Sequence, residues 1–245
     1  MQYAVLQLDL APPGVEALQR AFARTRSLCT RDAAHVARES LGIIAQHLEV
    51  FEARNLVAAL KDAGIAAQAV AQDQLAQLAP SPLVRRLDCI QAGLTLYDAL
   101  GRQTFVAWSE VTMVAAGVVV LIDTVAQASQ YYAVDGIDNY ATVRRNSRYA
   151  EKPTPHLLLD VVLRGSERYR ADGGRLTYDY LGQRRQPTAT ANFHLLVRDI
   201  LLFAPTAITN LGACAIRDGS DFTYTSRKTF ETEMIWRLWN QTRQR

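Results

Sequence analysis

A change of pattern at residues 77–83 constrains the fold of this chain more than any other feature. Before this stretch, amphipathic helical segments alternate with short strand-like segments, whereas after it short β-rich segments follow one another with glycines between them. The stretch contains Pro80 and Pro82, and proline fits neither the interior of a helix nor a central strand. The pattern therefore predicts two domains, residues 1–76 and 84–245, joined by a linker at 77–83.

The first domain is predicted to have the order β-α-α-β-α-β. Its elements are expected at 3–10, 15–25, 32–40, 41–50, 51–63 and 65–72. In the third helix Ala53, Leu56 and Leu60 recur on one face, and Gly64 follows as a natural helix stop. This order indicates a small unit in which helices cover a short sheet.

The phrase EARNLVAALKDAGIAAQAV at 52–70 resembles the end of the C-terminal domain of bacterial ribosomal protein L7/L12, a fold also seen in the ClpS adaptor. The resemblance covers roughly residues 3–72 and implies a docking fold, and a ferredoxin-like split β-α-β unit is the alternative. In that family a glycine-rich, lysine-bearing turn contacts translation factors. Residues 24–35 stand in its place and contain no glycine, so the resemblance implies the fold and no ribosomal role.

The second domain is predicted as a series of short antiparallel strands followed by a helix. Strands are expected at 84–93, 94–100, 103–111, 111–122 and 156–163, with a hairpin at 166–181 that turns at Asp-Gly-Gly. The helix at 190–205 buries Phe193, Leu196 and Ile200 on one face, with Asn192 as its expected cap. A final helix is expected in the tail at 226–243.

The phrase LTLYDALGRQTFVAWSEV at 94–111 is similar to the opening of bacterial pleckstrin-homology-like (PH-like) and GRAM-like domains, where a tryptophan and a β-branched residue three positions later recur. Trp108 and Val111 occupy those places here. The resemblance covers roughly 84–205 and implies an antiparallel barrel that a helix plugs. The predicted fold class is therefore α+β: a small β-α-α-β-α-β domain, then a PH-like β-barrel with a C-terminal helix and a long insert at 123–155.

Composition and motifs exclude several classes of function. The net charge of +3 is too small to imply nucleic acid by itself. Three widely spaced cysteines, without a C-x-x-C pair, favour neither disulfides nor zinc and fit a reducing cytoplasm. No signal peptide or membrane-spanning helix is expected, since the longest apolar run, 111–122, is too short. The motifs predict no catalytic residue, cofactor or metal ligand, and Glu231 and Glu233 are expected to be solvated.

The insert at 123–155 carries the strongest candidate binding residues. It lacks clear periodicity and combines arginines, which suit phosphate, with tyrosines, which stack on bases. The candidates are Tyr140, Arg144, Arg145, Arg148 and Tyr149. A solvated, flexible loop is the alternative. A second basic cluster, which includes Arg168 and Arg170, alternates with acidic residues and is expected to form weak surface ion pairs.

The tail contains Trp236 and Trp239, which either anchor in a groove of a partner or pack within the chain. Two docking folds without a catalytic constellation favour a cytoplasmic, non-enzymatic adaptor that binds another protein. One alternative is a binder of anionic lipid head groups or nucleic acid through the insert. A second alternative is an enzyme with a site between the domains, because catalytic groups can come together from distant parts of a chain.

Overall fold

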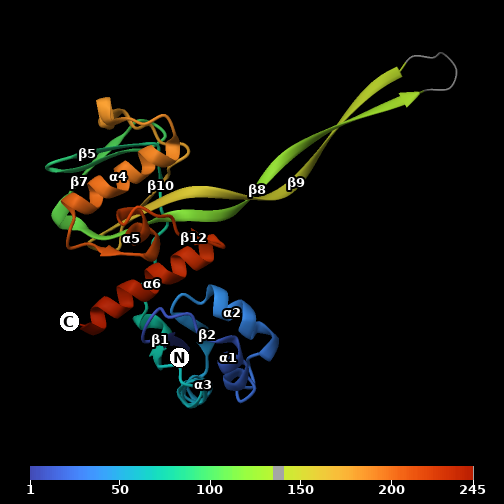
Figure 1. The fold of residues 1–245 in the computed structure, drawn as a ribbon, viewed down its shortest axis with the longest axis vertical. Helices are drawn as coiled ribbons and strands as arrows, with labels where there is room; N and C mark the ends of the chain where they lie inside the picture. The colour runs from blue at the N-terminus through green and yellow to red at the C-terminus, as the bar shows by residue number, and fades with distance from the viewer. Residues whose placement is uncertain (135–140, 245) are drawn as a thin grey trace.

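The computed structural model describes the backbone of residues 1–134 and 141–244, and the side chains of residues 1–124 and 150–244 (Figure 1). Helices and strands are both abundant and lie largely in separate layers, so the predicted α+β class is confirmed. The described strands form three sheets. None of these sheets closes on itself.

The N-terminal unit has its elements in the order predicted from the sequence. They are β1 (Tyr3–Gln7), α1 (Val15–Phe22), a 3-10 turn (Thr30–Asp32), α2 (Ala33–Glu39), β2 (Ile43–Leu48), α3 (Val50–Asp62) and β3 (Ala67–Ala71). The sheet is antiparallel with the order β2-β1-β3, so β2 is an edge strand. Phe22, Leu56 and Leu60 bury one face of this sheet. Helix α3 stops where Gly64 takes a φ of +83°, a conformation that glycine adopts without strain.

The second unit contains two sheets. The smaller is an antiparallel meander of β5 (Arg86–Ile90), β6 (Gly93–Tyr97) and β7 (Gln103–Ala107). The larger has the order β11-β8-β9-β10-β4, and β12 also pairs with β8. Its strands are β4 (Leu83–Val84), β8 (Val111–Val134), β9 (Ala141–Leu163), β10 (Arg168–Asp172), β11 (Ile208–Thr209) and β12 (Thr223–Tyr224).

The helices of the second unit are α4 (Ala189–Phe203), α5 (Leu211–Arg217) and α6 (Arg227–Gln244). Helix α4 places Phe193, Leu196 and Ile200 in one core with residues of both sheets, as its periodicity predicts. Its cap differs from the prediction: the Thr188 hydroxyl accepts a bond from the Ala191 amide, while Asn192 lies inside the helix.

The predicted closed barrel is not formed by the described strands. A short 3-10 turn (Trp108–Glu110) follows β7, and β8 then pairs with β9 rather than with the meander. Closure needs every edge strand to be paired, and here the meander stays a separate sheet across the core from the larger one. The predicted second strand of the hairpin at 166–181 is also wrong, because Thr177 makes only an isolated bridge to Arg86 and a 3-10 helix (Asp179–Arg184) follows.

Much of the predicted insert is β-structure rather than loop. Strands β8 and β9 pair continuously from Met113↔Val162 to Val134↔Ala141, and they project from the body as a two-stranded ribbon (Figure 1). Beyond Val119 on β8 and before Leu158 on β9, these strands pair only with each other among the described residues. We call this paired region, from Val120↔Pro155 outward, the arm.

Helix α6 lies between the two units and contacts both (Figure 1). Trp236 and Trp239 are 4% and 7% exposed, and they pack on the face of the N-terminal sheet that α1 and α3 leave open. The Trp236 indole donates a hydrogen bond to the Gln7 carbonyl at 2.8 Å. Its ring also fills the space that a side chain at Gly42 would need. Both tryptophans of the tail are therefore covered within the chain.

Candidate docking groove at the edge of the N-terminal sheet

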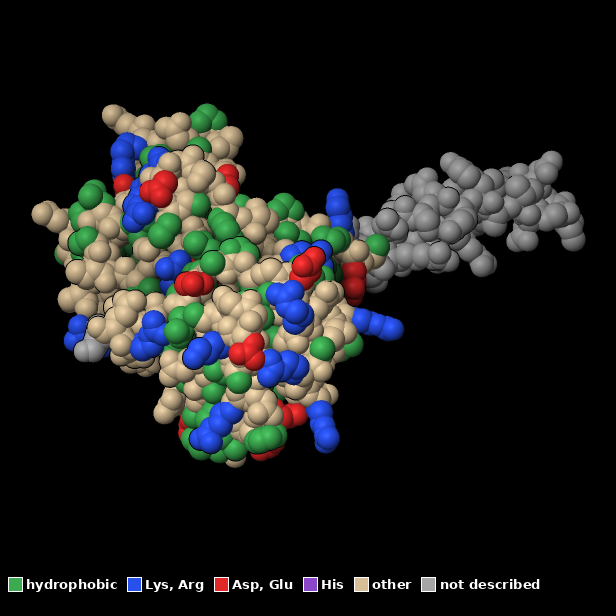
Figure 2. All heavy atoms as spheres, turned by 60° about the horizontal axis from the view of Figure 1, so that its bottom comes forward, with side chains coloured by type: hydrophobic (Ala, Val, Ile, Leu, Met, Phe, Trp, Pro, Cys, Tyr) green, Lys and Arg blue, Asp and Glu red, His purple; other side chains and the backbone are tan. Residues whose placement is uncertain are grey.

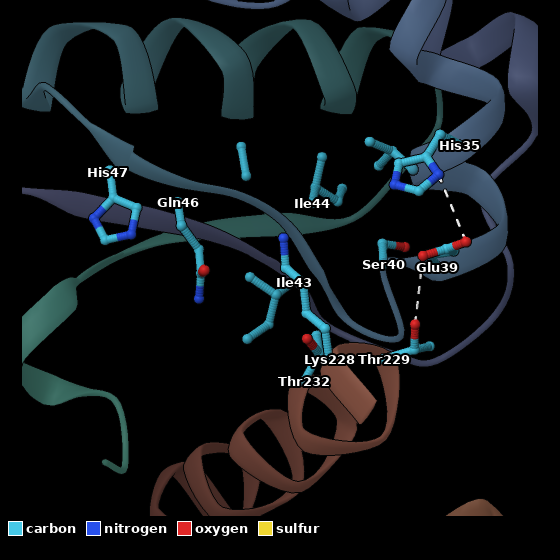
Figure 3. Close-up of a pocket in the computed structure, with 12 residues that line it drawn as sticks. His35, Glu39, Ser40, Ile43, Ile44, Gln46, His47, Lys228, Thr229 and Thr232 are labelled. Carbon is cyan, nitrogen blue, oxygen red and sulfur yellow. Dashed lines mark hydrogen bonds and ion pairs between the residues drawn. The ribbon is translucent and has the colours of Figure 1, made fainter. Parts of the chain in front are cut away.

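A groove of about 480 Å³ runs along β2 where the N-terminal unit meets α6 (Figure 3). Helix α2 forms one wall, and the first turns of α6 form the other. The lining side chains include His35 and Glu39 from α2, and Lys228, Thr229 and Thr232 from α6.

The groove follows the free edge of the sheet rather than one of its faces. Ile43 belongs to the core beneath Trp236, and Ile44 belongs to the core beneath α3, so the two side chains leave β2 on opposite faces. Both residues line the groove. Side chains from both faces of a strand can line one groove only where the groove runs along the edge of that strand. No other described strand pairs with this edge of β2.

The ladder between β1 and β2 is irregular opposite the groove. Ala45 pairs with Val5 and Leu48 with Tyr3, so Gln46 and His47 have no partner on β1. His47 takes a φ of +61°, which is uncommon for a residue with a side chain. Its ring nitrogen Nδ1 lies 2.9 Å from Gln2 Oε1. This bulged segment is thus held by side-chain bonds, and it borders the groove with backbone that the sheet does not use.

The charged groups of the groove differ in how they are paired. The Glu39 carboxylate lies 3.6 Å from His35 Nδ1 and accepts a 3.5 Å bond from the Thr229 hydroxyl. Lys228 forms no ion pair with any residue of the described chain and extends from α6 toward Ile43 (Figure 3). The Ser226 hydroxyl caps α6 by accepting a bond from the Thr229 amide.

The arginines predicted to form surface pairs include two that are buried. Arg170 donates to both Asp160 oxygens at 2.7 and 2.6 Å, and Arg168 lies 3.5 Å from the same carboxylate. Both guanidinium groups also contact Glu231 on α6. Burial raises the pKa of Asp160, while the two arginines oppose that shift. This network ties β9 and β10 to α6, with Asp160 and both arginines buried and Glu231, which was predicted to be solvated, half-buried.

Glu233 was predicted to be solvated, but it is fully buried. Its carboxylate accepts bonds from the Tyr224 hydroxyl at 2.6 Å, the Leu211 amide at 2.8 Å and Arg237 at 3.0 Å. Burial, followed by the Glu233 charge, raises the pKa of Tyr224. Asn210, at the start of α5, completes the cluster by donating to the same tyrosine oxygen. The group joins α5, β12 and α6 and has a structural role.

His156 lies at the base of the arm between two carboxylates. Its Nε2 is 2.9 Å from Asp123 and its Nδ1 is 3.1 Å from Asp172. A neutral imidazole carries only one N–H, so both contacts are hydrogen bonds only when the ring is protonated. Burial by itself lowers the pKa of His156, but the two carboxylates outweigh it and hold the pKa above its usual value.

The candidate binding residues of the insert lie only partly within the described chain. Tyr140 lies outside the described residues. Arg144, Arg145, Arg148 and Tyr149 lie on β9, where their Cα partners on β8 are Tyr131, Gln130, Gln127 and Ala126. Their side chains are also outside the described part. The backbone positions of these four candidates are thus on the arm and not at the groove.

The described residues also bear on other kinds of site. They contain no group of three or more metal-binding side chains. Burial raises the pKa of the Cys89 thiol to about 12, so this cysteine stays protonated and is a poor nucleophile at neutral pH. Among the same residues no helix is long and apolar enough to cross a membrane. Over the face in Figure 2, acidic and basic side chains are interspersed rather than gathered into a patch of one sign.

Comparisons with protein-family models, with curated proteins and with solved structures find no match. The groove was missed by the sequence analysis, because its two walls come from opposite ends of the chain. Thr229 and Glu39, which touch across it, are 190 positions apart.

Proposed function

We propose that this chain is a non-enzymatic adaptor that binds an extended segment of another protein along the edge of β2. The observation that carries the proposal is the unpaired edge of β2 inside a groove with two walls. An exposed edge strand offers free backbone N–H and C=O groups, and adding a strand from a partner is a common mode of peptide recognition. The groove walls would supply side-chain contacts beside that new strand.

Replacing Gln46 by proline is expected to weaken peptide binding about five- to thirtyfold, the effect of losing one or two backbone hydrogen bonds of about 1 kcal/mol each. Gln46 has no partner on β1, so proline is tolerated there better than elsewhere in β2. The probe is a displayed library of random octapeptides selected on the full chain. Fluorescence anisotropy then measures the affinity of the enriched peptides.

Thr232→Trp is the independent variant, because it fills the groove from α6 and leaves β2 intact. Both variants should keep the circular dichroism spectrum and melting temperature of the parent chain. Enriched peptides that bind both variants as tightly as the parent would rule out the β2 edge as their site. Failure to enrich any peptide would count against the adaptor function itself.

The arm supports a second candidate function, the binding of an anionic ligand. No other described strand pairs with the arm, and an isolated two-stranded ribbon is only marginally stable in water, which favours a partner along it. The sequence places three arginines within five positions on β9. These features fit nucleic acid or an anionic lipid surface.

Replacing Arg144, Arg145 and Arg148 together by alanine is expected to shift elution from a heparin column to lower salt. The physical reason is that fewer counterions are released when three cationic contacts are removed. The matched control replaces Arg20, Arg31 and Arg54, which are exposed on the N-terminal unit. Equal shifts for the two triple variants would show that the chain responds to net charge and that the arm has no specific role.

A further inference from the structure

We infer that the segment bound along β2 is acidic and places a carboxylate beside Lys228; this inference rests on the proposed function. Four ionisable side chains line the groove: His35, Glu39, His47 and Lys228. Some of these side chains already have a charged or polar partner within the chain, and others do not. An unpaired charge indicates the opposite charge on the ligand.

Among the described residues Glu39 is the one carboxylate that lines the groove, and each of its oxygens has a neighbour within the chain. Oε1 faces His35, and Oε2 accepts the Thr229 hydroxyl. Part of the capacity of Glu39 to accept bonds is therefore already used within the chain.

Lys228 is in the opposite situation. Its ammonium group can donate three hydrogen bonds and accept none. No carboxylate of the described chain forms an ion pair with it. The side chain extends from α6 toward Ile43 at the start of β2 (Figure 3). A strand added at this edge would pass within reach of the ammonium group. The unpaired positive charge of Lys228 favours an acidic side chain on that strand.

The composition of the first turn of α6 agrees with this inference. The positive end of a helix usually carries acidic residues, but this turn contains none and instead has Arg227 and Lys228. Two cations at this end oppose the helix dipole, so stability of α6 does not explain them. Of these two cations Lys228 lines the groove, where a carboxylate of an acidic segment would pair with it.

The test uses the same displayed library of random octapeptides on the parent chain and on Lys228→Glu. Peptides selected by the parent are expected to be enriched in Asp and Glu over the starting library, and peptides selected by Lys228→Glu are not. For the best parent peptide, changing its acidic residues to Asn or Gln should weaken binding about fivefold, as expected for a partly exposed ion pair. Lys61→Glu is the matched control, because Lys61 is exposed on α3 and does not line the groove.

Two failures can be told apart. Peptides that require an intact β2 edge but show no acidic enrichment, or that bind Lys228→Glu unchanged, would overturn the acidic partner and leave the docking edge in place. Peptides that are acidic but insensitive to Gln46→Pro and Thr232→Trp would overturn the docking edge itself. If Lys61→Glu lost as much binding as Lys228→Glu, the effect would be explained by the net charge of the chain. That result would also contradict the inference.

Discussion

Replacing Asp160 by asparagine is expected to lower the free energy of unfolding by about 3–5 kcal/mol, the usual cost of removing one partner of a buried ion pair. Asp160 is fully buried and accepts two hydrogen bonds from Arg170. Asparagine has nearly the same shape but no charge. The substitution would leave Arg168 and Arg170 with only Glu231 to balance two buried cations. Denaturation with urea, followed by circular dichroism, measures the change.

Asp218→Asn is the control for this prediction, because Asp218 pairs with Arg217 on the surface. Exposed pairs contribute about 0–1 kcal/mol, so this variant should unfold almost as the parent does. If Asp160→Asn lowered the free energy of unfolding by an equally small amount, the buried network would not be what holds β9 and β10 to α6. A double change of Asp160 to leucine and Arg170 to methionine should be less damaging than Asp160→Asn, since it removes both charges of the main pair.

Replacing Trp236 by alanine is expected to cost about 3–5 kcal/mol and to loosen the N-terminal unit from the rest of the chain. The indole is buried between β1, β2 and α6, and it donates to the Gln7 carbonyl. Alanine leaves a cavity at this junction and an unsatisfied carbonyl. We expect trypsin to cleave after Arg85 or Arg86, just past the predicted linker at 77–83, before either unit is digested.

Gly42→Ala tests the same contact from the other side. A methyl group there would meet the Trp236 ring, and the φ of +96° already disfavours any residue except glycine. This variant should also increase tryptic cleavage after Arg85 or Arg86. Leu202→Ala is the control, because Leu202 is largely exposed on α4 and lies far from the junction in the chain. If neither variant altered cleavage, Trp236 could not be the contact that holds the two units together.

The extent of sequence-based prediction differs between the two units. In the N-terminal unit, each helix has its apolar residues at helical spacing and each strand is short and bounded by turns, so all six main elements occur in the predicted order. In the second unit, the strands of the meander and the face of α4 were also predicted. The pairing of the strands was not predicted. Strands β8 and β9 pair along the arm, whereas the low periodicity of the insert indicated a loop.

In the N-terminal unit, the meander and α4, the sequence by itself determined where helices and strands form, because that depends on local spacing of apolar residues and on glycine or proline at their ends. The tertiary structure alone decided which charges are buried. Asp160 and Glu233 look like ordinary surface acids in the sequence, and only their positions against Arg170 and Tyr224 show that they are covered. It also decided the candidate site, since the groove needs β2 and α6 side by side. Contacts between segments so distant in the chain depend on how whole units pack, which local periodicity does not encode.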